Sequence, residues 1–213
     1  MQLIGMLDSP YVRRVAVSLQ LLGLPFQHRS LSVFRTFDQF RAINPVVKAP
    51  TLVCDDGTVL MDSTLILDYA EHLAAPRSLK PASLADRPHA LRVTGLALAA
   101  CEKSVQIIYE RTLRPAAKQH APWLDRVTGQ LLAACAALEA EVARAPLAAT
   151  SATIDQAGVS TAVAWQFMTQ TSVAEIVRAD AYPALRDFSA RAETLPEFRA
   201  APHGEGVYRG GTQ

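Results

Sequence analysis

The sequence of 213 residues has few cysteines, almost no net charge and no long apolar run. Its three cysteines, Cys54, Cys101 and Cys135, stand too far apart for a disulfide framework and fit a reducing compartment. A formal net charge of +1 argues against nucleic-acid binding, which normally requires a basic excess. No segment approaches the ~18–20 apolar residues that span a bilayer, and Met1–Asp8 lacks the basic start of a signal peptide. We therefore expect a soluble, globular, cytoplasmic protein.

Glycine is sparse in the second part of the chain, where alanine is abundant. Residues 1–80 contain 6 alanines and residues 81–213 contain 30. Because alanine favours helices and disfavours strands, the second part is predicted to be all helical, whereas the first mixes strands with helices. Two prolines within 75–81 mark a seam between the parts. We expect an α/β domain at 1–76, an all-helical domain at 82–203 and a loose, glycine-rich tail at 204–213.

The first part is predicted to run in the order β-α-β-α-β-β-α. Its predicted strands lie at 2–6, 26–31, 51–54 and 59–61. Its predicted helices lie at 10–22, 36–42 and 62–72. Gly23 is expected to end the first helix. The second part is predicted to contain helices near 83–112, 122–144, 153–168 and 182–194. Thr153 and Gln156 have the spacing of a capping box, in which the threonine is the N-cap.

Ser9 precedes Pro10, at the point where the first strand turns into the first helix. A hydroxyl there lies beside the unpaired N–H groups and the positive dipole end of the helix, a place that favours an anion such as a thiolate. Serine is also a common N-cap, so the position alone does not separate a structural cap from a functional group. Arg13 and Arg14, on the same helix, are expected on its solvated face.

Two further positions could bind a ligand. Pro50 stands at a strand entry, where proline marks an edge, a bend or a cis bond. A cis bond would turn the backbone N–H and C=O of Ala49 outward, although most X–Pro bonds are trans. Asp62 and Ser63 open a helix, where they could hold the ammonium and the carboxylate of an amino-acid head group. Simple N-capping by either residue is the alternative.

Several other chemistries find no support in the sequence. The five histidines show no metal-ligand spacing, so no metal is expected. Ser9 lacks the context of a nucleophile elbow, which disfavours a serine hydrolase. The chain also contains no glycine motif for binding the phosphates of a nucleotide or dinucleotide.

In combination, these features resemble the glutathione S-transferase family over essentially the whole chain. The resemblance rests on Ser9–Val15, Asn44–Leu52 and Asp62-Ser63, with later support from 109–115, 153–156, 182–185 and 195–198. It implies a thioredoxin-like N-terminal domain that binds glutathione and an all-helical C-terminal domain that shapes the pocket for a second substrate. It also implies a homodimer.

The resemblance assigns Ser9 as the catalytic residue, whose hydroxyl would donate a hydrogen bond to the sulfur of glutathione. It makes Pro50 cis, so that the backbone of Ala49 would pair with the cysteinyl unit. Lys48 would then lie near the glycyl carboxylate.

The resemblance places Asp62 and Ser63 at the γ-glutamyl end of glutathione. Candidates for the co-substrate pocket are Tyr11, Tyr109 and Arg111. The implied activity is a transferase that activates the thiol of bound glutathione for attack on a hydrophobic electrophile. A non-catalytic protein that binds glutathione and hydrophobic ligands and a glutathione-dependent isomerase remain the alternatives.

The chain departs from the family pattern at four places. Position 9 is serine rather than cysteine, which disfavours disulfide exchange because a hydroxyl cannot form a mixed disulfide. Met6 and Leu7 stand where other classes carry a tyrosine. Val47 replaces the usual glycine of the loop before Lys48. Gln156 replaces the usual aspartate of the late capping box.

Overall fold

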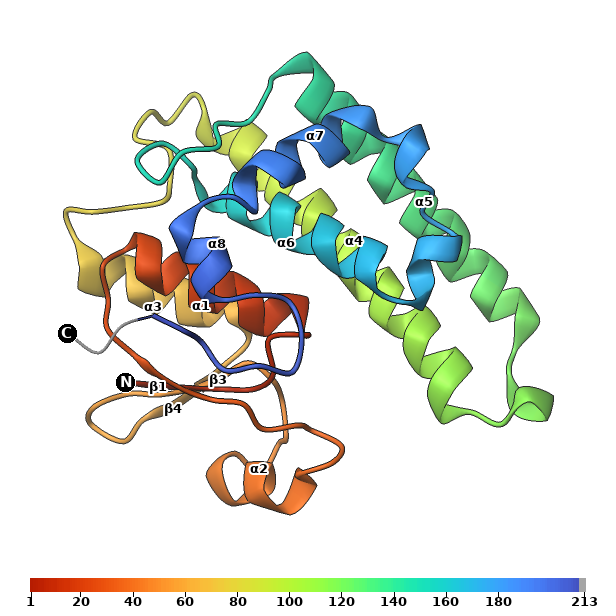
Figure 1. The fold of residues 1–213 in the computed structure, drawn as a ribbon, viewed down its shortest axis with the longest axis horizontal. Helices are drawn as coiled ribbons and strands as arrows, with labels where there is room; N and C mark the ends of the chain where they lie inside the picture. Colours follow the sequence, from red (N-terminus) through yellow and green to blue (C-terminus); the bar gives the residue numbers. More distant parts are fainter. Residues whose placement is uncertain (211–213) are drawn as a thin grey trace. The chain divides into compact units, whose positions relative to one another are not determined.

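The chain folds into two compact units in a computed structural model that describes residues 1–210 (Figure 1). The first unit comprises Met1–Lys80 together with Thr194–Gln213, and the second comprises Pro81–Glu193. The break after Lys80 falls within the proline-containing segment 75–81.

A four-stranded sheet forms the centre of the first unit. Its strands are β1 (Gln2–Ile4), β2 (Gln27–Arg29), β3 (Thr51–Val53) and β4 (Val59–Met61), in the order β2-β1-β3-β4. β1 runs parallel to β2 and antiparallel to β3, and β3 and β4 form an antiparallel hairpin. Leu3 and Leu52, paired across β1 and β3, are completely buried, so the core lies against the middle of the sheet.

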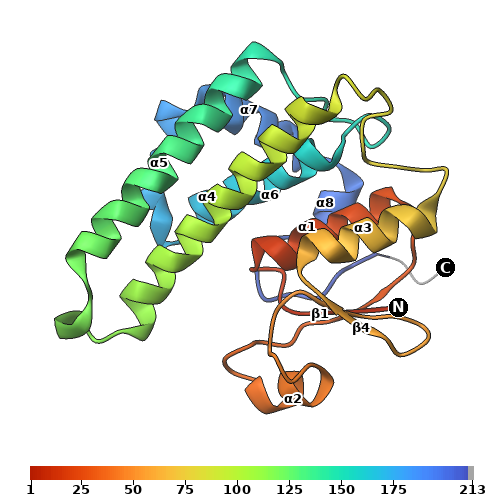
Figure 2. The same cartoon turned by 180° about the vertical axis from the view of Figure 1, so that it is seen from behind.

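Helices cover the two faces of this sheet. α1 (Pro10–Leu21) and α3 (Ser63–Ala74) pack side by side on one face, and α2 (Phe37–Ile43) lies on the other (Figures 1 and 2). Parallel strands need a crossover, and α1 provides it between β1 and β2. Gly23 ends this crossover helix with a φ of 73°, as predicted. This is the thioredoxin-like arrangement that the sequence led us to expect.

A short helix from the far end of the chain completes the first unit. α8 (Pro196–Ala200) packs on α1 because Arg13 reaches it: the Arg13 Nε donates to the carbonyl of Ala201 at 2.7 Å. The Arg13 guanidinium also lies 5.6 Å from the centre of the Phe198 ring. This packing corrects the expected domain boundary, because 194–203 belongs to the first unit and not to the helical domain.

The expected tail at 204–213 is also attached to the first unit. Tyr208 stacks on Phe26 with ring centres 4.6 Å apart, and its backbone N–H donates to Nδ1 of His28 at 3.0 Å. The prediction of a loose tail is therefore wrong for the residues that the structure describes. Residues 211–213 of that prediction lie outside the described residues.

The second unit is all helical within the described chain, as predicted. Its α-helices are α4 (Arg87–Leu113), α5 (Ala121–Arg144), α6 (Gln156–Gln170) and α7 (Pro183–Ala192). Short 3-10 turns lie at Ala116–Lys118, Ser172–Glu175 and Ala179–Ala181. α6 is buried on nearly all sides and packs on α4 and α7, while α5 packs on α4. No helix among residues 1–210 combines the length and apolarity that crossing a membrane requires.

The start of α6 differs from the predicted capping box. Asp155 is the N-cap, and its Oδ1 accepts the backbone N–H of Gly158 at 2.8 Å. Thr153 instead shares a hydrogen bond of 2.6 Å with the hydroxyl of Thr150. The helix begins later than expected, so the aspartate occupies the capping position and Gln156 is the first helical residue.

Candidate active site

Ser9 is the N-cap of α1, directly before Pro10 in the first turn. Its Oγ faces the backbone N–H of Val12 at 3.4 Å, and the side chain is half-buried. A hydroxyl has two acceptor lone pairs and one hydrogen, so capping an N–H leaves that hydrogen available to a ligand. The structural and the functional role of Ser9 are therefore compatible.

Gly5 brings a second loop close to the Ser9 turn. Its φ is 134°, and an added Cβ would lie 2.6 Å from Cγ2 of Val12 and 3.2 Å from Cβ of Ala49. Only glycine allows this approach without displacement of its neighbours. The end of β1, the start of α1 and the loop that contains Ala49 thus meet around Gly5.

That loop has the predicted cis bond, between Ala49 and Pro50. Its shape is held by Thr51, whose hydroxyl donates to the carbonyl of Lys48 at 2.7 Å. Val47 has a φ of 52°, so the position where the family usually has glycine does require left-handed backbone here. The side chain of Lys48 is exposed.

Asp62 and Ser63 lie where β4 passes into α3. Asp62 is the N-cap, and its Oδ1 accepts the backbone N–H of Thr64 at 2.9 Å. Ser63 is buried, and its Oγ accepts a hydrogen bond of 3.0 Å from Nη1 of Arg14 on α1. An ionised carboxylate has a second oxygen, which allows Asp62 to accept a further donor.

The contact between Arg14 and Ser63 was not predicted from the sequence. Arg13 and Arg14 are only 1% and 2% exposed, so their assignment to a solvated helix face is wrong. α3 covers α1 on the side of Arg14, and α8 covers it on the side of Arg13. Two adjacent arginines look the same in the sequence whether their side chains are buried or solvated.

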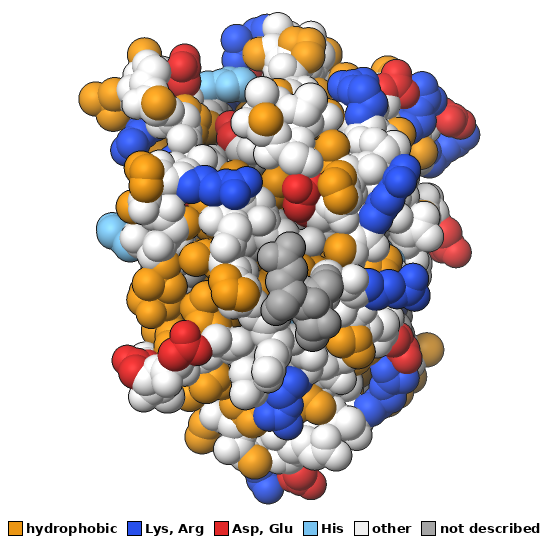
Figure 3. Space-filling model, turned by 60° about the vertical axis from the view of Figure 1, so that its left-hand side comes forward, with side chains coloured by type: hydrophobic (Ala, Val, Ile, Leu, Met, Phe, Trp, Pro, Cys, Tyr) orange, Lys and Arg blue, Asp and Glu red, His pale blue; other side chains and the backbone are white. Residues whose placement is uncertain are grey.

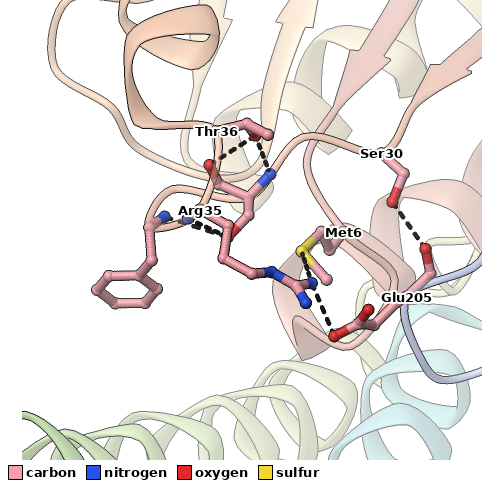
Figure 4. A network of polar contacts seen from close by, with 7 residues as sticks. Met6, Ser30, Arg35, Thr36 and Glu205 are labelled. Atoms are coloured by element: carbon pink, nitrogen blue, oxygen red, sulfur yellow. Dashed lines mark hydrogen bonds and ion pairs between the residues drawn. The ribbon is translucent and has the colours of Figure 1, made fainter.

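A polar network beside the Ser9 turn was also missed (Figure 4). The Arg35 guanidinium forms an ion pair of 2.7 Å with Glu205 and lies 3.7 Å from Sδ of Met6. The hydroxyl of Ser30 donates to the backbone carbonyl of Glu205, 175 residues away in sequence. Burial raises the pKa of the Asp8 carboxyl, which lies near this network. The separation in sequence explains why no local motif pointed to Glu205.

The predicted co-substrate residues fall in both units. Tyr11 is half-buried on α1, whereas Tyr109 and Arg111 are exposed residues of α4. Their assembly into one pocket stays a prediction. Among residues 1–210, no group of three or more His, Cys, Asp or Glu side chains is placed to hold a metal ion.

Two helix starts in the first unit can favour negative charge. Two helix N-termini, those of α1 and α3, each carry a serine hydroxyl together with the positive end of a helix dipole. α1 links the two starts: Ser9 is its N-cap, and Arg14 on the same helix donates a hydrogen bond to Ser63.

Comparison with known proteins gives a family match for the first unit. Residues 3–78 match the family model "Glutathione S-transferase, N-terminal domain". This match places the first unit of the chain in the glutathione S-transferase family. Its fold is similar to that of a glutathione S-transferase from Methylobacterium radiotolerans, crystallised with glutathione sulfonate. That structure has a TM-score of 0.84 and 23% sequence identity, with 94% of this chain and 93% of the other covered.

Two further relatives extend the comparison. A family member from Pseudomonas fluorescens, crystallised with glutathione, is 29% identical with a TM-score of 0.78, covering 94% of this chain and 97% of that one. Glutathione S-transferase U4 of Arabidopsis thaliana is 25% identical over 117 residues, which are 50% of this chain. The chain spans about half the length of that curated relative (52%).

All three cysteines are buried, and none forms a disulfide within the described chain. Burial raises the pKa of Cys54 and raises that of Cys135 to about 12. Because the thiolate is the reactive form, neither thiol is activated as a nucleophile.

Proposed function

We propose that this protein is a glutathione transferase that activates the thiol of bound glutathione for attack on a hydrophobic electrophile. The observation that carries the proposal is Ser9 at the N-terminus of α1, with its hydroxyl hydrogen left over from capping. That hydrogen would be donated to the sulfur of glutathione, and the positive end of the helix would stabilise the thiolate. A free thiol has a pKa of ~8.5, and lowering it by about two units corresponds to ~2.7 kcal/mol.

The remaining residues would hold the tripeptide in place. Ala49, beside Gly5 and the Ser9 turn, would pair its backbone with the cysteinyl unit, and Lys48 would attract the glycyl carboxylate. Asp62 would accept the ammonium of the γ-glutamyl end, and Ser63 would donate to its carboxylate. These roles are supported by the resemblance to the family and by the position of each residue at a loop or a helix start.

The electrophile would bind near Tyr11, Tyr109 and Arg111. Serine in place of cysteine at position 9, together with buried cysteines, supports bound glutathione as the source of reactive sulfur. We place the reaction in the cytoplasm, as a step in detoxification. An isomerase or a non-catalytic binding protein would have the same glutathione site. Unlike the proposed transferase, neither would conjugate glutathione to an electrophile.

The test of the proposed function is the pKa of bound glutathione. Thiolate absorbance is titrated for the wild type, Ser9→Ala and Ser9→Thr, the last of which keeps a hydroxyl. We expect the pKa of bound glutathione to rise toward ~8.5 in Ser9→Ala and to stay low in Ser9→Thr. An unchanged pKa in Ser9→Ala would exclude the catalytic role of Ser9.

We further propose that two copies of the chain form a homodimer through the exposed side of α3. Leu65, Tyr69 and Leu73 repeat every four residues along that helix and are 65%, 37% and 47% exposed. In Figure 3, hydrophobic side chains gather along the left-hand side of the surface that faces the viewer. Light scattering should give the mass of a dimer for the wild type and of a monomer for Leu65→Glu combined with Leu73→Glu. A wild-type monomer would exclude the proposal.

A further inference from the structure

Arg14 is a buried cation directed at the first turn of α3. It is 2% exposed, and its Nη1 donates to Oγ of Ser63 at 3.0 Å and to Oγ1 of Thr64 at 3.2 Å. Burying a charge is costly unless it is well hydrogen-bonded, so a guanidinium placed here needs these contacts. The same contacts bring a full positive charge next to the positive end of the helix dipole.

The Arg14 contacts also decide which way the two hydroxyls point. A guanidinium can only donate, so Ser63 and Thr64 must accept from it through a lone pair. Each hydroxyl keeps its single hydrogen for another partner. Both hydroxyls are therefore set as donors, which is the polarity that a carboxylate ligand requires.

Arg13, the preceding residue, provides a natural comparison. It is just as buried, but it donates to the backbone carbonyls of Ala201 and Phe198. Those contacts attach α8 to α1 and involve no proposed ligand residue. Both arginines are thus buried on α1, and they differ in the groups to which they donate hydrogen bonds.

We propose that Arg14 is a positioning residue for the carboxylate of the γ-glutamyl end of glutathione. It acts through Ser63 and Thr64, whose hydrogens it leaves directed to the ligand, and it strengthens the positive potential at the start of α3. This inference rests on the proposed function. It predicts that the effect of Arg14 depends on the presence of one carboxylate in the ligand.

The experiment pairs protein variants with two ligands. The dissociation constant is measured by calorimetry for glutathione and, by competition, for an analogue whose γ-glutamyl carboxylate is replaced by hydrogen. We expect Arg14→Gln to raise the Kd of glutathione about 10- to 30-fold and that of the analogue less than about 3-fold. Arg14→Lys, which keeps the charge, should show a smaller loss with the same dependence on the carboxylate.

Arg13→Gln is the matched control. It should lower the melting temperature and weaken both ligands equally, if at all. The loss in Arg14→Lys should appear as a higher KM for glutathione, because Arg14 is proposed to act on the binding of glutathione and not on its sulfur. If Arg14→Gln does not fold, Arg14→Lys carries the test.

Two results have separate meanings. Equal loss of affinity for both ligands in the Arg14 variants, or no loss for either, would overturn the positioning role while glutathione binding by the wild type stands. Failure of the wild type to bind glutathione would instead overturn the proposed function, and this inference with it.

Discussion

The backbone N–H of Tyr208 donates a hydrogen bond of 3.0 Å to Nδ1 of His28, which lies 180 residues earlier in the chain. An N–H group can only donate, so Nδ1 of His28 carries no hydrogen and Nε2 carries it. Nε2 then donates to the carbonyl of Gly5 at 2.7 Å. The described C-terminal segment is thereby attached to β2 by a histidine that must be neutral.

The first prediction concerns the pH dependence of stability. Burial lowers the pKa of His28 below its ordinary value of 6.5, and burial also lowers that of His203. The unfolded chain then binds more protons than the folded chain below pH 6.5. The free energy of unfolding should therefore fall as the pH falls from 6.5 toward the lower pKa of the folded state.

Urea unfolding at about pH 7.5 and about pH 5.5 measures this change. His28→Gln should reduce the difference in unfolding free energy between the two pH values, because glutamine does not titrate. His203→Gln measures how much His203 contributes to the same difference in unfolding free energy. The same pH dependence in the His28 variant and the wild type would contradict the role of His28.

The second prediction concerns Val47, whose φ of 52° is unfavourable for a β-branched residue. Left-handed backbone costs an L-residue about 1–2 kcal/mol, whereas glycine costs about 0.5–1 kcal/mol in lost chain entropy. Val47→Gly should therefore raise the free energy of unfolding by ~0.5–1 kcal/mol, as measured by urea unfolding.

Val46 is the matched control for that substitution. It is 62% exposed and lies in the same loop, but it is not among the non-glycine residues with positive φ in the described chain. Val46→Gly should lower the free energy of unfolding by about 0.5–1 kcal/mol, since it adds only entropy to the unfolded state. Changes of the same sign in both variants would show that the backbone of Val47 is not strained.

The third prediction concerns a helix cap within the second unit. Both carboxylate oxygens of Glu139 on α5 accept backbone N–H groups at the start of α7, from Ala184 at 2.8 Å and Leu185 at 2.9 Å. A negative charge on these N–H groups satisfies donors that the helix cannot satisfy itself. Glu139→Ala should cost about 1–2 kcal/mol in urea unfolding. Glu102→Ala, on an exposed face of α4, should stay within about 0.5 kcal/mol, and equal effects would refute the cap.

Most of the fold could be predicted from local features of the sequence. Pro10 and Gly23 mark the ends of α1 because each suits a special backbone geometry, and alanine content separates the helical unit from the first. The residues of the proposed glutathione site lie at helix starts and in a proline loop, which are also visible locally. These features depend on neighbours within a few positions.

Long-range packing could not be predicted in the same way. The burial of Arg13 depends on Ala201, which is 188 residues away, and the ion pair of Arg35 depends on Glu205. A side chain on a helix surface carries no sign of which distant segment will cover it. The prediction of the α6 cap was wrong for a different reason. Thr153 and Asp155 are both good N-caps, and the choice between them depends on packing.

The last prediction concerns the reactivity of the cysteines. Cys54 is 7% exposed and Cys135 is completely buried with a pKa of about 12, so alkylation of the folded protein should be slow and should reach Cys54 before Cys135. Iodoacetamide labelling at neutral pH, followed by mass spectrometry, gives the rate at each site. Labelling in urea serves as the control, because unfolding exposes all three thiols.

The proposed transferase activity should survive the alkylation of Cys54 if the reactive sulfur belongs to glutathione. The hydroxyl of Ser9 is not alkylated under these conditions, so the proposed donor to the sulfur is left intact. Activity lost in proportion to the modification of one cysteine would instead place a protein thiol in the reaction. Cys54→Ala then distinguishes chemical participation from steric damage, because alanine removes the thiol without adding bulk.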